Sequence, residues 1–455
     1  MLSTRLPDEL ILLIFANVVF DSTGKSPEDI VKGLAITTAV CKLWRSLAIN
    51  DPTLWALIHV GSSEITPQAH RISALRFDRV ATFLRRSQSA PLVLVINRPE
   101  APRGLPAYEF SDMEKEWISM YDLLRPHMNR CRNLKVTNNA REPSTTRELL
   151  GLLQTPEFPL LEEFSFIDRR VVMSEYDRSA FKHSWRMGAS TTPLKSFQFT
   201  SWVSHLPTSL DVAWPALETL DLSLEESCWP EISQTLARLT SLQTLHINII
   251  RMDLSGSRVS PSSPTRIVLH ELRHLTTNYL PIWYYIQTPS LSSINLKDLD
   301  PYNPWNEEFS RECGPKSPQL FTELAACVRE VQFQDSFLEL QLTIPFLREL
   351  KSVTKLVFRD CAALHDVISY LSANIHGSTP QPISLLSSEE MDVDGAALSL
   401  WGWRERGEEF LPALSSVTFV NQILACGLTD TRGLADRLTK MGIRVSWHVD
   451  DFAEQ

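Results

Sequence analysis

The sequence predicts an α/β protein in which a short helical module precedes a long solenoid with parallel strands. Two observations lead to this fold class. In the first sixty residues, apolar side chains recur at helical spacing. Further along the chain, a short strand-like unit returns about ten times, with helix-like segments between some of the copies. We therefore expect a helical domain at residues 1–60 and a repeat domain at residues 61–455.

Composition narrows the class of protein. A chain of 455 residues is too long for one ordinary compact core, so several domains or a repetitive array are expected. Its 44 Lys and Arg residues against 54 Asp and Glu residues give a net charge of -10, which argues against nucleic acid and acidic membranes as partners. Seven scattered cysteines without a C-x-x-C pair, and no Asn-x-Ser/Thr site, favour an intracellular location in cytoplasm or nucleus.

A first helix is predicted at LPDELILLIF, residues 6–15. Pro7 suits a first helical turn, where its missing N–H costs nothing, and the acidic pair behind it favours the positive end of the helix. Leu6, Leu10 and Ile14 share one apolar stripe. The apolar run also resembles the core of a signal peptide, but its acidic flank and short length argue against a signal or a membrane span.

A second helix is predicted after the break at residues 24–27. Its apolar stripe consists of Ile36, Val40, Trp44 and Leu47, and the Asn-Asp-Pro sequence at residues 50–52 ends it and caps a short third segment. Three short helices cannot bury so many apolar side chains by themselves. Part of this surface must therefore be covered by the rest of the chain or by a partner.

The pieces LPDEL, IF, VCKLWRSLA and PTLW, in this order, resemble an F-box, especially the F-boxes of fungal proteins. The resemblance covers about residues 4–58 and implies docking on the Skp adaptor of a cullin ubiquitin ligase. The connection Asn17–Gly33 is longer than in the compact form of the family. The residues that the resemblance implies for adaptor contact are Leu6, Pro7, Leu10, Ile14, Phe15, Val40, Cys41, Trp44, Leu47, Leu54 and Trp55.

The remainder of the chain repeats the pattern apolar-x-x-apolar-x-apolar, which predicts a short strand with one buried face. Many intervals between copies suit leucine-rich repeats, in which stacked units share one continuous core. The helix and strand at residues 71–96 are expected to open the array. Strong copies begin at Leu161, Leu194, Leu217, Leu242, Leu291, Val328, Val353 and Leu414, and weaker ones at Cys131 and Leu272.

An ordinary parallel α/β sheet is the alternative architecture. It would have longer β-branched strands and glycine-rich turns, whereas the chain has only 15 glycines and no G-x-G-x-x-G motif. In the repeat reading, the residues between the apolar positions line an exposed concave sheet, which is where we expect a protein client to bind. The representative positions are Gln198, Asp221, His246, Asn295, Gln332 and Lys355.

Two segments interrupt the array. Residues 376–409 are rich in Pro, Ser and acidic residues, the composition of a mobile surface insertion. A DVDG sequence within it lacks the further carboxylates of a calcium loop. A second, uncharged loop is predicted at residues 255–264.

Residues 270–274 read HELRH, a literal H-E-x-x-H motif. On a helix, His270 and His274 would share a face and could bind zinc, with Glu271 activating a water molecule. The downstream ligands of such hydrolases are missing, and Leu272 and Leu275 fit a repeat strand, on which the two histidines would not converge. The motif is therefore interpreted as part of the array, with no metal or other cofactor.

These observations predict a substrate-recognition subunit of a Skp–cullin–F-box ubiquitin ligase, without chemistry of its own. The helical module would bind the Skp adaptor, and through it a cullin, while the repeats would bind a protein client. Two alternatives stay open: a leucine-rich-repeat interaction protein with no ligase role, and a zinc hydrolase at His270.

Overall fold

The structure is a computed structural model of all 455 residues. It divides into two compact units, Met1–Gln234 with Ile250–Asp253, and Thr235–Ile249 with Leu254–Gln455. The residues that the structure describes are 6–20, 27–61, 74–99, 107–139, 149, 152–153, 158–168, 194–200, 216–225, 229–251, 266–299, 327–336, 343, 346–347, 350–361, 413–420, 439–440 and 443–448.

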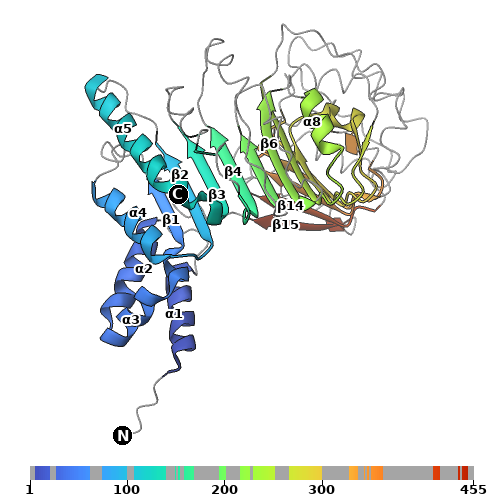
Figure 1. Ribbon diagram of the computed structural model, residues 1–455. Helices are drawn as coiled ribbons and strands as arrows, with labels where there is room; N and C mark the ends of the chain where they lie inside the picture. Colours follow the sequence, from blue (N-terminus) through green and yellow to red (C-terminus); the bar gives the residue numbers. More distant parts are fainter. Residues whose placement is uncertain are drawn as a thin grey trace, which may run out of the picture. The chain divides into compact units, whose positions relative to one another are not determined.

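The first unit begins with a helical domain (Figure 1). The predicted second helix is in fact two helices, because the chain bends at Val40 and restarts with Cys41 as a new N-cap. The predicted long connection is also largely helical, since one helix runs on to Phe20 and the next begins at Pro27. The elements are α1 (Asp8–Phe20), α2 (Pro27–Ala39), α3 (Lys42–Asn50) and the 3-10 helix η1 (Pro52–Trp55).

A parallel sheet follows without a linker, because its first strand starts two residues after η1. Helix α4 (Ala74–Arg86) lies between the first two strands in the chain, and α5 (Ala107–Leu124) with η2 (Arg125–Arg130) lies before the third. The strands of this unit pair in sequence order, all parallel: β1 (Leu57–Gly61), β2 (Leu92–Arg98), β3 (Cys131–Asn138), β4 (Glu163–Asp168), β5 (Ser196–Thr200) and β6 (Thr219–Glu225).

The core of this sheet is a set of aligned apolar rows. The registers place Phe164 beside Phe197 and Phe166 beside Phe199, and all four side chains are buried. Their rings stack, with centroids 5.4 Å apart in the first pair and 5.6 Å in the second. Each strand alone presents only two or three apolar residues, so the hydrophobic core exists only because neighbouring strands align them.

The second unit repeats this arrangement. A further pair of short strands, β8 (Ile267–Val268) and β10 (Ile286–Gln287), accompanies the 3-10 helix η5 (Leu280–Tyr284). Helix α8 (Trp229–Leu236), most of which belongs to the first unit, precedes the first main strand in the chain. The main strands are parallel and pair in the order β7 (Thr244–Arg251), β9 (His274–Thr277), β11 (Ser293–Lys297), β12 (Glu330–Gln334), β13 (Lys355–Arg359), β14 (Ser416–Val420) and β15 (Arg444–His448).

The predicted parallel sheet is confirmed: a strand lies at each of the ten predicted positions. The predicted helix before Leu242 is also present as α8. Four strands were not predicted: β1 and β15 of the main sheet and the short pair β8 and β10. The strand β1 starts inside the range assigned to the helical domain. The two predicted loops at residues 255–264 and 376–409 lie outside the described residues, as does most of the helix predicted before Val328.

Within the described residues, no helix is both long and apolar enough to cross a membrane.

Candidate functional site

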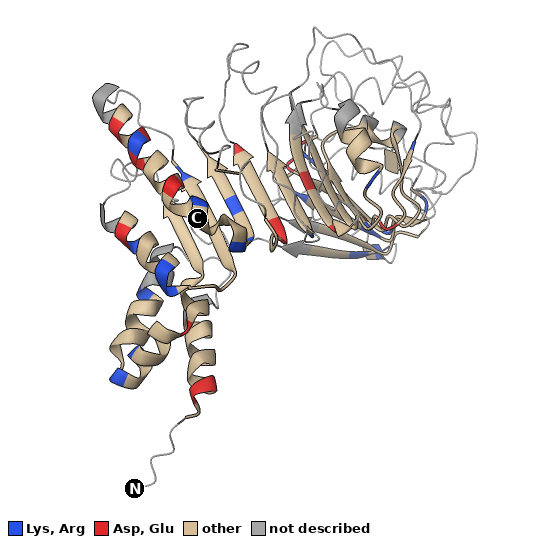
Figure 2. Ribbon diagram, viewed as in Figure 1, with Lys and Arg blue, Asp and Glu red and all other residues tan. Residues whose placement is uncertain are grey.

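Exposed apolar side chains gather on the helical domain. The described chain exposes eleven large hydrophobic residues, and eight of them lie between Leu6 and Leu43. Figure 2 shows few charged positions along α1 to α3. Burying such side chains against a partner is favourable because apolar surface leaves water. The eight residues form what we call the apolar face: Leu6, Leu10, Leu13, Ile14, Val18, Ile36, Val40 and Leu43.

Helix α1 divides its apolar residues between two faces. Ile11 and Phe15, four residues apart, point into the domain and are buried. Leu10 and Ile14 lie on the other side, and Leu13 is 57% exposed. Asp8 and Glu9 occupy the first turn, where their charges favour the helix dipole. The helix is thus apolar on both faces, one for its own core and one left open.

Exposed apolar residues also lie on α2 and α3 and at the bend between them, where the chain joins the two helices tightly. The Arg45 Nε donates to the Thr38 carbonyl at 2.9 Å, and the Trp44 N–H donates to the Cys41 sulfur at 3.5 Å. These bonds fix the bend at Val40, so this side chain stays exposed beside Cys41. Ile36, one turn earlier, is 62% exposed.

The aromatic residues of the domain pack in its interior. The rings of Phe15 and Trp44 meet edge to face with centroids 5.0 Å apart. The Trp55 indole N–H donates to the Ala48 carbonyl at 2.7 Å, and Leu54 beside it is buried. Phe15, Leu54 and Trp55, three of the residues expected to contact an adaptor, are thus buried in the chain itself. Adaptor contact by these three residues stays a prediction.

The remaining predicted adaptor residues fall into two groups. Trp44 and Leu47 are half-buried. Adaptor contact through the exposed ones stays a prediction. The exposed group consists of Leu6, Pro7, Leu10, Ile14, Val40 and Cys41. Sequence reasoning did not assign Leu13, Val18, Ile36 and Leu43 to the site, although apolar residues at helical spacing next to Leu10, Ile14 and Val40 were a signal for them.

The helical domain is fixed to the sheet at Trp55. Phe83 of α4 meets the Trp55 ring edge to face at 5.1 Å, and the Arg86 guanidinium carbon lies 4.3 Å from the ring centroid. Asp51 accepts the Thr53 N–H at 2.9 Å, which caps η1. Trp55 therefore packs against both the helical domain and α4, which belong to the same compact unit.

The outward face of the sheet is polar, as predicted. In the first unit the Ser165 hydroxyl bonds Gln198 Oε1 at 2.5 Å, and Gln198 Nε2 donates to Asp221 Oδ2 at 2.8 Å. These residues occupy aligned positions on β4, β5 and β6. The bonds hold the side chains in one arrangement across three strands.

The second unit presents the other predicted client positions. His246, Asn295 and Gln332 are half-buried at outward positions, and His246 and Asn295 both align with Thr276. Lys355 Nζ lies 2.9 Å from Glu330 Oε1 on the neighbouring strand. Each of the six predicted positions is thus partly accessible on a strand, and client binding by them stays a prediction.

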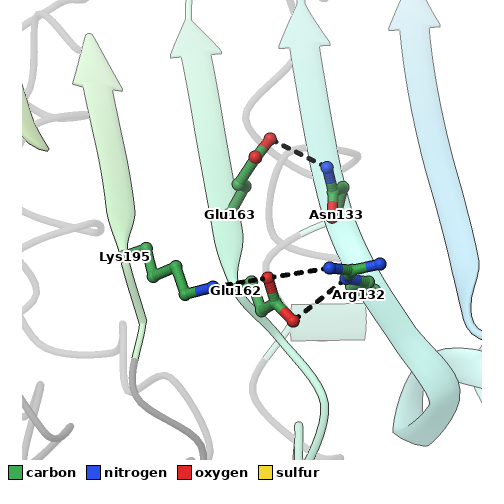
Figure 3. A network of polar contacts seen from close by, with 5 residues as sticks. All are labelled: Arg132, Asn133, Glu162, Glu163 and Lys195. Atoms are coloured by element: carbon green, nitrogen blue, oxygen red, sulfur yellow. Dashed lines mark hydrogen bonds and ion pairs between the residues drawn. The ribbon is translucent and has the colours of Figure 1, made fainter. Parts of the chain in front are cut away.

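A charge network lies where the strands of the first unit start (Figure 3). Glu162 accepts hydrogen bonds from Arg132 Nε at 3.0 Å and from Lys195 Nζ at 3.2 Å. These hydrogen bonds lower the pKa of Glu162, with the Arg132 bond as the larger cause. Asn133 Nδ2 donates to Glu163 at 2.8 Å in the next row. The Glu162 carboxylate is thus paired with two cations, while Glu163 bonds a neutral amide.

The HELRH segment is a turn followed by a strand. His270 and Glu271 are exposed in the turn before β9, and His274 opens that strand. The helical spacing that would place both histidines on one metal ion is therefore not formed here. Among the described residues, no group of three or more His, Cys, Asp or Glu side chains is arranged to hold a metal ion.

Comparison with known families bears on the helical domain. Residues 3–60 match the family model described as F-box-like. This range contains α1, α2, α3, η1 and the whole apolar face. F-box domains are typically adaptor modules that bind the Skp adaptor, so this domain suggests a Skp-binding role in ubiquitin ligase complexes. No match to a curated protein was found for the chain.

Proposed function

We propose that this chain is the substrate-recognition subunit of a Skp–cullin–F-box ubiquitin ligase. The observation that carries the proposal is the apolar face, eight exposed large side chains on a domain that matches the F-box-like family. Fully burying one such side chain contributes about 1.5–3 kcal/mol. A Skp adaptor seated on α1 and on the bend between α2 and α3 would cover this surface, and a cullin would join through the adaptor.

In this proposal the chain supplies proximity rather than catalysis. The outward face of the parallel sheet would hold a client protein, and its hydroxyl and amide side chains suit a polar protein surface or an extended peptide. In this proposal each strand of the sheet belongs to one leucine-rich repeat. Because Trp55 packs against both α4 and the F-box-like helices, adaptor and client would be held in a fixed relation near β1.

The test replaces residues of the apolar face and measures co-purification with the Skp adaptor. The double variant Leu6→Ala, Leu10→Ala removes two exposed side chains without touching the core. The matched control is Leu160→Ala, Val268→Ala, which removes two apolar residues elsewhere that are 40% and 41% exposed, against 51% and 46% for Leu6 and Leu10. We expect the first variant to lose the adaptor and the control to keep it.

Two outcomes would contradict the proposal. If the Leu6/Leu10 variant captures the adaptor as well as the wild type, the apolar face is not the docking site. If neither the wild type nor the control binds, the chain is an interaction protein without a ligase role. Circular dichroism of each variant checks that the fold is retained.

A further inference from the structure

In each unit, one row of residues crosses the strands where they start. The charges of the residues in this row differ between the two units. We call it the strand-start row. Main-chain hydrogen bonds define it, because each residue donates its N–H to the carbonyl of the row residue on the preceding strand. In the first unit, the row consists of Arg132, Glu162, Lys195 and Glu218, with N···O distances of 2.8 to 2.9 Å.

The first-unit row alternates in charge, and three of its members form ion pairs with one another. Glu162 lies between Arg132 and Lys195 and pairs with both. Figure 3 shows the carboxylate between the two cations. A charged partner would have to displace these pairs, so this row offers no net charge to bind.

The second-unit row has the same backbone pattern but contains no acidic residue. Its N–H to carbonyl bonds are again 2.8 to 2.9 Å long. Both arginines are exposed, and no described carboxylate forms an ion pair with either. The row consists of Gln243, Arg273, Ser292, Arg329, Thr354 and Ser415, and the N–H of Arg444 on the last strand donates to Ser415.

The hydroxyl groups in this row are engaged by the backbone. Ser292 Oγ donates to the Arg273 carbonyl at 3.0 Å, Thr354 Oγ1 to the Arg329 carbonyl at 3.1 Å, and Ser415 Oγ to the Thr354 carbonyl at 3.0 Å. The hydroxyls thus hold the row in place and leave the guanidinium groups as its charged, accessible members. Arg329 Nη1 uses one of its donors on the Ser352 carbonyl at 3.2 Å.

Nearby acidic residues do not neutralise these arginines. Glu330 is paired with Lys355 at 2.9 Å, and Glu271 lies exposed in the turn before Arg273. The acidic residues Asp298 and Asp335 come directly after the C-terminal ends of β11 and β12, at the opposite edge of the sheet from the strand starts. Arg273 and Arg329 therefore lie exposed at strand starts, without an ion pair to any described carboxylate, in a chain with a net charge of -10.

We propose that the strand-start row of the second unit binds an acidic, extended segment of the client protein. This inference rests on the proposed function and names the chemistry of the client. Arg273 and Arg329 lie two strands apart, roughly 10 Å, which an extended peptide spans in about three residues. A client segment with a carboxylate at about every third residue would match both guanidinium groups, which bind carboxylates in bidentate geometry.

A peptide fits this row better than a nucleic acid does. Single-stranded nucleic acids are held by aromatic stacking together with cations that follow the backbone. The described row has no aromatic member, and its hydroxyls alternate with its cations. An acidic protein segment needs only the separated charges that are present.

The experiment titrates the full chain, without adaptor, with a fluorescein-labelled peptide of Gly and Ser that carries Glu at every third position. The same peptide with Gln in place of Glu is the neutral probe, and an oligothymidylate of equal charge is the nucleic-acid probe. The variant is Arg273→Ser, Arg329→Ser. Its matched control is Arg132→Ser, Lys195→Ser, which removes the same charge from the same row of the first unit.

We expect the wild type to bind the Glu peptide about tenfold more tightly than the Gln peptide, and this preference to weaken with salt. The Arg273/Arg329 variant should lose the preference, and the first-unit control should change affinity less than about twofold. Equal losses in both variants, no preference for Glu, or tighter binding of oligothymidylate would overturn the proposal. Adaptor binding is measured in a separate experiment. If the Glu peptide does not bind, the proposed ligase role is unaffected, and if the adaptor does not bind, the peptide result is unaffected.

Discussion

The guanidinium carbon of Arg86 lies 4.3 Å from the ring centroid of Trp55, and this contact joins the last turn of α4 to the F-box-like domain. Phe83 and the Ala48 carbonyl hold the same indole from other sides. Trp55 is therefore shared by the two parts of the first unit.

The first prediction concerns this tryptophan. Trp55→Ala should lower the free energy of unfolding by about 3–5 kcal/mol, because it leaves a large cavity between α3 and α4. Arg86→Ala should cost only about 0.5–2 kcal/mol, the range for cation–π contacts from exposed to desolvated sites, because Arg86 is half-buried over a buried ring. Urea denaturation measures both. Similar losses of unfolding free energy in the two variants would show that the Arg86 charge, and not the packing of Trp55, holds α4 against the F-box-like domain.

The second prediction concerns Gly61 at the end of β1, which has a φ of 91°. A Cβ atom added there would lie 1.7 Å from the Asn97 carbonyl oxygen on the paired strand. Gly61→Ala should therefore destabilise the protein by about 3 kcal/mol, through the left-handed backbone and the displaced neighbour. A melting temperature equal to that of the wild type would mean that the two strands separate at little cost.

The third prediction concerns pH and Tyr121, a buried residue of α5. Burial raises the pKa of Tyr121 to about 12, although the nearby Arg98 charge lowers it in part. Because the folded-state pKa lies above the unfolded value, this group's contribution is complete below about pH 10 and is lost as the pH rises toward 12. Between pH 9 and pH 11 the wild type should lose about 1 kcal/mol more than Tyr121→Phe.

Urea denaturation of both proteins at the two pH values gives this difference. Cys131 and Cys361, whose pKa values burial raises to about 12, weaken both proteins alike over this range, so they cancel in the comparison. Equal losses for wild type and variant would place the Tyr121 hydroxyl in contact with solvent.

The fourth prediction is a footprint of the adaptor on Cys41. This free thiol is exposed beside Val40, whereas the Cys131 and Cys361 thiols are buried. Iodoacetamide near pH 8 should modify Cys41 and spare the two buried thiols, because their raised pKa values leave little thiolate. Bound adaptor should protect Cys41, as followed by mass spectrometry of each cysteine. Unchanged labelling of Cys41 in a complex that has formed would place the adaptor elsewhere.

The strands were predictable because each repeats the same burial pattern. Alternate apolar positions, such as Phe197 and Phe199 on β5, must face the core if the polar residues between them are to stay hydrated. The strand β1 was missed because it starts directly after η1, and Trp55, which occupies the leading apolar position of its repeat unit, had been assigned to the helical domain. The strand β15 was missed because Gly442 stands where the repeat has its leading apolar residue.

The adaptor surface was predicted only in outline. Helix α1 reads DELILLIFANVVF and is apolar on almost every side, so spacing could not decide whether Leu10 or Ile11 faces the core. That choice depends on tertiary contacts, above all on the meeting of Phe15 with Trp44. The different charges of the two strand-start rows needed the hydrogen-bond register, which aligns residues far apart in the sequence.

The most direct test of the account is the binding of the purified full-length chain to a purified Skp adaptor, measured by isothermal titration calorimetry. The account predicts a one-to-one complex with a dissociation constant below about 1 μM, or about -8 kcal/mol. It also predicts a negative heat-capacity change, because the apolar face leaves water. No detectable heat at several temperatures, with the chain folded, would contradict the central claim.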